Sequence, residues 1–162
     1  MGNLIIGDKA LFSIRLETDG HFASASIFCE HEELGNNDEY TLLHTLISLI
    51  ETKINNYDYS LADKINHLDK ESVYIYVVNG YEESTDWRES HELESIWITL
   101  NLTPCFDGEI FILLSIKQCD RVIWKKFNSK VIRESFLPPG YVLEHMRSLL
   151  NNLLKQQIKT SH

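Results

Sequence analysis

The 162-residue chain has few of the features that mark secreted or membrane proteins. Its three cysteines are odd in number and show no C-x-x-C spacing, which argues against a disulfide framework and favours a reducing compartment such as the cytoplasm. No run approaches the roughly 18 apolar residues that a membrane span needs. The early apolar stretch at residues 4–6 is too short for the core of a signal peptide. We therefore expect a cytoplasmic protein that does not cross a membrane.

Sequence motifs of catalysis are missing as well. The seven glycines form no Gly-x-Ser-x-Gly elbow, no Gly-x-x-x-x-Gly-Lys phosphate loop and no Gly-x-Gly-x-x-Gly turn. The tightest group of metal-ligating residue types, Cys29 to Glu33, contains one cysteine and one histidine, whereas a zinc site needs roughly three or four ligands. None of the cysteines directly precedes an expected helix, where a thiol pKa would be lowered. We expect no catalytic residue, no metal and no cofactor.

Positive charge is also scarce. Lys and Arg number 15 against 24 Asp and Glu, which gives a net charge of -9 at pH 7. A negative field of this size repels the phosphate backbone of nucleic acids and attracts basic surfaces. The composition therefore predicts a basic protein partner and argues against direct binding of nucleic acid.

Alternating apolar and polar residues predict an antiparallel sheet. Residues 10–29 contain two alternating runs that are joined by Asp19-Gly20, a pair that favours the positive φ angles of a tight hairpin. Further along the chain, β-branched and alternating segments predict a meander of short strands. The expected strands after the hairpin are residues 73–78, 96–100, 110–116, 121–127 and 130–136.

Helical spacing of leucine and isoleucine predicts two longer helices and one short one. Residues 41–55 carry their apolar side chains on one side, with Asn37 or Asp38 as the cap. Residues 60–68 are expected to form a short helix, and residues 140–158 an amphipathic helix that covers a sheet face. Pro138-Pro139 ends the last strand and sets the start of that helix, because proline cannot donate to a sheet but suits a first helical turn.

This order of elements predicts an α+β fold. Runs of strands with an N-terminal-half helix and a C-terminal helix, and no regular βαβ alternation, indicate one antiparallel sheet (hairpin plus meander) packed against the helices. A chain of 162 residues with 43% hydrophobic residues has the size of one domain with one core. We expect residues 1–162 to form a single domain.

Two acidic segments are the best candidates for a binding surface. Residues 81–94 hold six acids against Arg88, and residues 30–39 hold five acids with no basic residue, whereas residues 117–133 have a local charge of +5. The 79–94 segment is expected to be a long loop with at most one helical turn. Tyr81 and Trp87 lie among its acids, and exposed aromatics with polar rims anchor protein interfaces, although either ring fits a core equally well. The candidate binding residues are Tyr81, Glu82, Glu83, Asp86, Trp87, Glu89, Glu92, Glu30, Glu32 and Glu33.

Parts of the chain resemble a known family. The stretch Asp120-Arg121-Val122-Ile123-Trp124, a turn, and then residues 134–140 before a helix resemble immunity proteins of bacterial polymorphic and contact-dependent toxin systems. Residues 6–14 and the Leu-rich helix from Thr41 are similar to the N-terminal half of the forty-second such family. The resemblance implies a small cytosolic protein that binds a cognate toxin, often a nuclease, and neutralises it by covering the active site.

Three hypotheses follow. The first is a stoichiometric inhibitor that occupies the substrate groove of a basic nuclease toxin with acidic and aromatic side chains. The second is a small enzyme with a dispersed thiol or metal site. The third is a structural homo-oligomer that buries the Leu-rich face of a helix against another copy. The protein encoded immediately upstream distinguishes these hypotheses, since a toxin-tipped secreted protein there supports the first.

Overall fold

The computed structural model describes residues 2–35 and 38–161, and the chain divides into two compact units. The first unit comprises Met1–Asn55, Asn101–Asp107 and Val142–His162. The second comprises Asn56–Leu100 and Gly108–Tyr141. Because each unit is assembled from segments that are distant in sequence, neither is a contiguous stretch of chain. On this basis we propose that both units belong to the single domain expected for residues 1–162.

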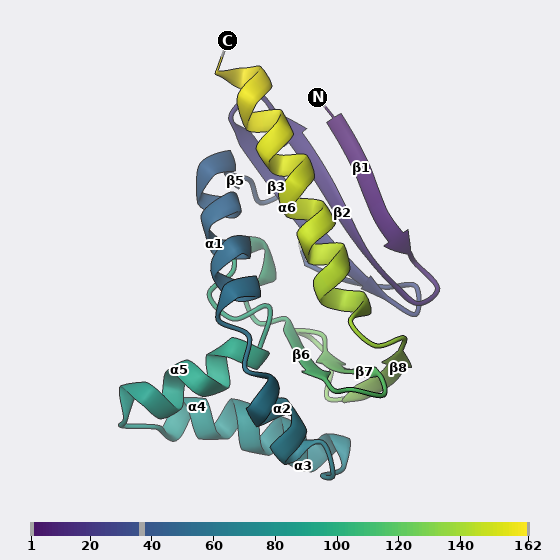
Figure 1. Cartoon of the computed structure of the whole chain (residues 1–162), viewed down its shortest axis with the longest axis vertical. Helices are drawn as coiled ribbons and strands as arrows, with labels where there is room; N and C mark the ends of the chain where they lie inside the picture. The colour runs from purple at the N-terminus through teal and green to yellow at the C-terminus, as the bar shows by residue number, and fades with distance from the viewer. Residues whose placement is uncertain (1, 36–37, 162) are drawn as a thin grey trace. The chain divides into compact units, whose positions relative to one another are not determined.

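The first unit is a five-stranded antiparallel sheet with two helices. Its strand order is β1-β2-β3-β4, and β5 also pairs with β3. Figure 1 shows the C-terminal helix α6 lying along the sheet of β1, β2 and β3. A short 3-10 turn, η2 (Pro104–Phe106), packs against β3. The bounds are β1 Gly2–Asp8, β2 Phe12–Asp19, β3 Phe22–Cys29, β4 Glu32–Leu34, β5 Thr41–Leu42, α1 Leu43–Asn55 and α6 Tyr141–Thr160.

The predicted hairpin and N-terminal-half helix are both present in this unit. Asp19 pairs with Phe22, so the turn between β2 and β3 is Gly20-His21 and lies one residue after the predicted Asp19-Gly20. Gly20 has a positive φ of 60°. α1 buries apolar side chains at helical spacing, but it begins at Leu43, because residues 41–42 pair with β3 instead. Asp38 therefore does not cap α1, and Asn37 lies outside the described residues.

The second unit joins a three-stranded antiparallel sheet, in the order β6-β7-β8, to a group of helices. The Tyr57 hydroxyl connects the start of α2 to β6, since it donates to the Leu113 carbonyl and accepts from the Ser115 amide, each at 2.7 Å. α4 and α5 lie side by side (Figure 1). The bounds are α2 Tyr59–Ile65, α3 Lys70–Tyr74, π-helical η1 Ile75–Asn79, α4 Gly80–Glu83, α5 Trp87–Ile96, β6 Ile110–Ser115, β7 Asp120–Lys125 and β8 Arg133–Leu137.

The α+β class is confirmed, but three segments of the second unit differ from the sequence prediction. Residues 73–78 are helical instead of a strand, and residues 79–94 form α4 and most of α5 instead of a loop. Residues 96–100 are the end of α5 and a turn, with one bridge between Trp97 and Ile112. The meander therefore begins at β6, and it forms a sheet separate from the N-terminal hairpin.

The junction between β8 and α6 follows the prediction at the strand end, because Pro138 comes directly after β8, but α6 begins at Tyr141, so the prolines precede its first turn. Gly140 has a φ of 76° after the two prolines, and its N–H donates to Asp120 Oδ1 at 3.0 Å. The buried Asp120 carboxylate also accepts from Ser115 Oγ at 2.7 Å, so the same group holds the β6–β7 connection and the start of α6. No helix in residues 2–35 or 38–161 is long and apolar enough to cross a bilayer.

Candidate protein interface

α3, η1 and α4 form one continuous helical stretch, which we call the 70–83 helix. Its first turn is capped by Asp69, whose Oδ1 accepts from the Ser72 amide at 2.7 Å, and this hydrogen bond lowers the pKa of the carboxyl group. The backbone stays in the right-handed helical region through Ile75, Asn79 and Gly80. The Gly80 N–H donates to the Ile75 carbonyl, the i to i-5 bond of a π turn.

Helix α5 starts with an aspartate cap and an exposed aromatic ring. Asp86 Oδ1 accepts from the Arg88 amide at 2.9 Å, and Ser84 Oγ donates to Glu89 Oε2 at 3.3 Å. Trp87 is 73% exposed, and the Arg88 guanidinium lies 5.5 Å from the centre of its ring. The cap thus fixes where α5 begins and places the Trp87 ring on the surface of the second unit.

A close helix contact fixes how α4 and α5 pack. An added Cβ at Gly80 would lie 3.2 Å from Leu93 Cδ1, so the absence of a side chain at Gly80 allows the approach. Leu93 and Ile96 are buried. Tyr81 is half-buried and packs edge-to-face against Trp97, with 5.8 Å between the ring centres. Of the two aromatic candidates, Trp87 is on the surface and Tyr81 contributes to packing.

The acidic candidates of this segment lie on a helical hairpin. Their carboxylates belong to two packed helices and the turn between them, so the structure brings them together on one unit. Asp86 and Glu89 also serve the start of α5, whereas Glu82 and Glu83 end the 70–83 helix. The exposed acidic residues are Glu82, Glu83, Asp86, Glu89 and Glu92.

The second group of candidates lies on the first unit, in the hairpin of β3 and β4. Glu30 and His31 form its two-residue turn, with φ angles of 48° and 68°. Glu33 pairs with Arg15, whose Nη2 donates to Glu33 Oε1 at 2.5 Å. Glu30 is exposed, and Glu32 and Glu33 are half-buried. Most of this group therefore serves the sheet edge, and Glu30 offers the most accessible carboxylate.

Ile75 and Tyr76 are surface residues that sequence reasoning missed. They are 55% and 39% exposed on the π-helical turn, although the sequence placed them in a strand. The helical phase was nevertheless readable, because Val73, Val77 and Tyr81 recur every four residues on the inner side.

The surroundings of Cys29 and Cys105 disfavour an activated thiol. Burial, with smaller effects of Glu30 and Glu32, raises the pKa of Cys29 well above its usual value, and burial also raises the pKa of Cys105. A raised pKa keeps the thiol protonated, and the thiolate is the nucleophile. Among residues 2–35 and 38–161, no three His, Cys, Asp or Glu side chains are grouped as a metal site requires.

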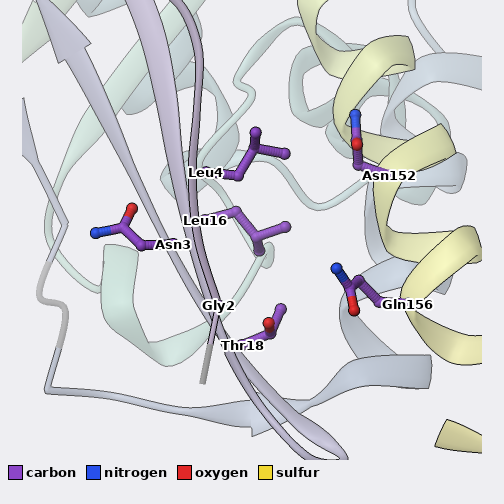
Figure 2. A pocket seen from close by; sticks show the side chains of 7 residues that line it. All are labelled: Gly2, Asn3, Leu4, Leu16, Thr18, Asn152 and Gln156. Carbon is purple, nitrogen blue, oxygen red and sulfur yellow. The ribbon is translucent and has the colours of Figure 1, made fainter. Parts of the chain in front are cut away.

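A pocket of about 200 Å³ lies between the β1–β2 edge and α6 in the first unit. Figure 2 shows Leu4 and Leu16 pointing toward Asn152 and Gln156, whereas Asn3 points away. Its volume is below the range of about 300–1,000 Å³ that is usual for small-molecule sites, and no charged side chain lines it. The pocket is a weaker candidate than the acidic helical hairpin.

The fold and these surfaces describe a small α+β protein whose most prominent features are exposed acidic and aromatic side chains. Comparison with protein families identifies the class as immunity proteins, which generally act by binding rather than by catalysis. The chain belongs to the immunity protein 42 family, whose model matches residues 4–152. No curated protein and no solved structure matches the chain.

Proposed function

We propose that this immunity protein neutralises a cognate toxin by placing the acidic hairpin of α4 and α5 over the toxin's active site, with the toxin a basic nuclease and the complex formed in the cytoplasm. Family membership supports the antitoxin role. The acidic net charge and the exposed carboxylates support a basic target, because nucleases need positive charge where they hold phosphate.

The exposed ring of Trp87 is the observation on which the proposed surface depends. An indole that is 73% exposed gains little from folding, but it contributes a large apolar area when a partner covers it. Acidic side chains surround it in the sequence and on the same two helices. An aromatic centre with a charged rim is the usual composition of a high-affinity interface.

The position of Glu82 and Glu83 is a second argument for binding. Both lie in the last turn of the 70–83 helix, where a carboxylate faces the negative end of the helix dipole. Each carboxylate at this position lowers the stability of the helix by on the order of 0.3–1 kcal/mol. Helix stability does not account for these two carboxylates, which supports a role for them in attracting a basic partner.

Trp87→Ala tests whether the Trp87 ring holds the complex together. Against the domain encoded immediately upstream, we expect a loss of on the order of 2 kcal/mol in binding free energy, mainly through faster dissociation. Phe127→Ala is the matched control, because Phe127 is a 67% exposed aromatic of the same unit in the basic segment. Surface plasmon resonance measures both, and thermal denaturation checks folding.

Reversing the charge of acidic rim residues tests whether they speed association with the toxin. Glu82→Lys with Glu83→Lys should chiefly slow association and reduce its salt dependence, because rim charges guide encounter. Glu51→Lys with Asp63→Lys is the control: it changes the net charge equally at exposed helical positions outside the hairpin. A similar slowing in the control would attribute steering to net charge and not to this surface.

Two results would contradict the proposal. If the wild-type chain neither binds nor inhibits the upstream-encoded domain, the toxin partner is wrong. If it binds but a folded Trp87→Ala variant retains full affinity, the surface is elsewhere, and the hairpin at Glu30, Glu32 and Glu33 is tested next by the same assay.

A further inference from the structure

The 70–83 helix has a core side and an exposed side. Val73, Val77 and Val78 are buried. The exposed side carries two apolar side chains, Ile75 and Tyr76, in the middle of a row of polar ones. Its exposed residues are Glu71, Ile75, Tyr76, Asn79, Glu82 and Glu83.

A π turn lies within this stretch. The wider turn closed by the bond from the Gly80 N–H to the Ile75 carbonyl accommodates an additional residue. Along this turn Val77 and Val78 are buried, and Ile75 and Tyr76 are exposed.

Folding accounts for apolar side chains at these two positions only in part. Ile and Tyr are poorer helix formers than Gln, Glu or Lys, and folding removes only part of each side chain from water, since Ile75 is 55% and Tyr76 39% exposed. π turns in helices occur frequently at functional sites. Exposed apolar groups with a polar rim mark protein interaction surfaces.

We propose that Ile75 and Tyr76 form an apolar centre of the toxin-binding surface, with Glu71, Glu82 and Glu83 as its rim. The inference rests on the proposed function and extends the interface from the α4–α5 turn along the 70–83 helix. The partner surface that fits is an apolar pocket bordered by lysine or arginine side chains.

Charge favours a toxin over a second copy as the occupant. In a two-fold symmetric dimer the same face meets itself, so the rim carboxylates of Glu71, Glu82 and Glu83 would be brought close to their own copies. Like charges placed together across an interface are unfavourable, whereas a basic rim pairs with them. A chain with a net charge of -9 adds a general repulsion between copies.

The test combines Ile75→Gln with Tyr76→Gln. The probe is the domain encoded immediately upstream, made inactive by substitution in its own catalytic residues. We expect about a tenfold or greater increase in Kd, mostly through faster dissociation, in a variant that remains folded by thermal denaturation. Ile158→Gln is the matched control, since Ile158 is a 62% exposed isoleucine on α6, and its Kd should equal that of the wild type. Tyr76→Phe keeps the ring and should retain binding.

The outcomes separate this inference from the proposed function. If Trp87→Ala weakens binding and the Ile75→Gln, Tyr76→Gln variant does not, the toxin surface remains but does not extend along the 70–83 helix. If the wild type does not bind the domain, both proposals fail. If sedimentation shows a dimer of the wild type that the double variant dissociates, a second copy covers this face and the inference is overturned.

Discussion

Arg121 connects three parts of the second unit, and its removal gives a quantitative prediction. Its side chain on β7 is 7% exposed. Nε and Nη2 donate to Glu134 Oε2 on β8 at 3.0 and 2.9 Å, and Nη1 donates to the carbonyls of Asn66 and Leu68 at 2.9 and 2.8 Å. The guanidinium also lies 5.9 Å from the centre of the Phe136 ring. One side chain therefore joins β7, β8 and the segment after α2.

The expected cost of Arg121→Ala follows from these contacts. Removing one partner of a buried ion pair costs roughly 3–5 kcal/mol, because the other charge stays desolvated. The Glu134 side chain is 30% exposed, so water compensates part of the loss and the lower limit applies. We expect the unfolding free energy to fall by about 3 kcal/mol and the melting temperature by about 6–12 °C. The unfolding free energy of Arg121→Lys should lie between those of the wild type and Arg121→Ala, because a lysine ammonium group keeps the charge but not the planar arrangement of donors.

Tryptophan fluorescence is the appropriate assay for this loss. Trp87, Trp97 and Trp124 are the three tryptophans of the chain, and all lie in the second unit, so their emission during urea unfolding reports on it. Lys117→Ala removes an exposed cation near Arg121 in sequence and serves as the control. A loss below about 1 kcal/mol for Arg121→Ala, the value of a surface pair, would refute the reasoning.

Three further predictions concern stability, thiols and metal. Glu30→Asn with His31→Gly should stabilise the chain by about 1 kcal/mol in thermal denaturation, because both positions have positive φ and Asn-Gly suits such a turn; an unchanged melting temperature would contradict this. A thiol reagent should modify Cys119 in the native protein, but the buried Cys29 and Cys105 only on unfolding. Chelator should leave the melting temperature unchanged, whereas about one zinc per chain in elemental analysis would refute that prediction.

The elements that were predicted correctly combine a clear period with local turn chemistry. Asp19-Gly20 located the first hairpin to within one residue of its turn at Gly20-His21, and Pro138-Pro139 marked the end of the sheet, two residues before α6 begins. β1 was missed because nearly all of its side chains are exposed, so the alternation that a half-buried strand shows is absent.

The helices of the candidate site were missed for a different reason. β-branched residues at 73, 75, 77 and 78 favour a strand by intrinsic propensity, but packing on the core overrides that preference. A usable signal did exist, since Asp86 is followed three residues later by Glu89, the spacing of a capping box at a helix start. Sequence reasoning named the acidic residues of the site, but not the helical hairpin that positions them or the exposed pair before them.

The side chains assigned to stability and those assigned to binding are separate, which makes the two roles distinguishable by experiment. Arg121 is buried and its loss should lower the unfolding free energy by about 3 kcal/mol, whereas Ile75, Tyr76 and Trp87 are 55%, 39% and 73% exposed and their loss should lower it less. Gln has a better helix propensity than Ile or Tyr, which offsets part of the burial energy that the Ile75→Gln, Tyr76→Gln variant loses, so this variant should stay close to the wild type in stability. If toxin binding weakens in a variant that is as stable as the wild type, misfolding does not explain the loss. It requires that these side chains contact the partner.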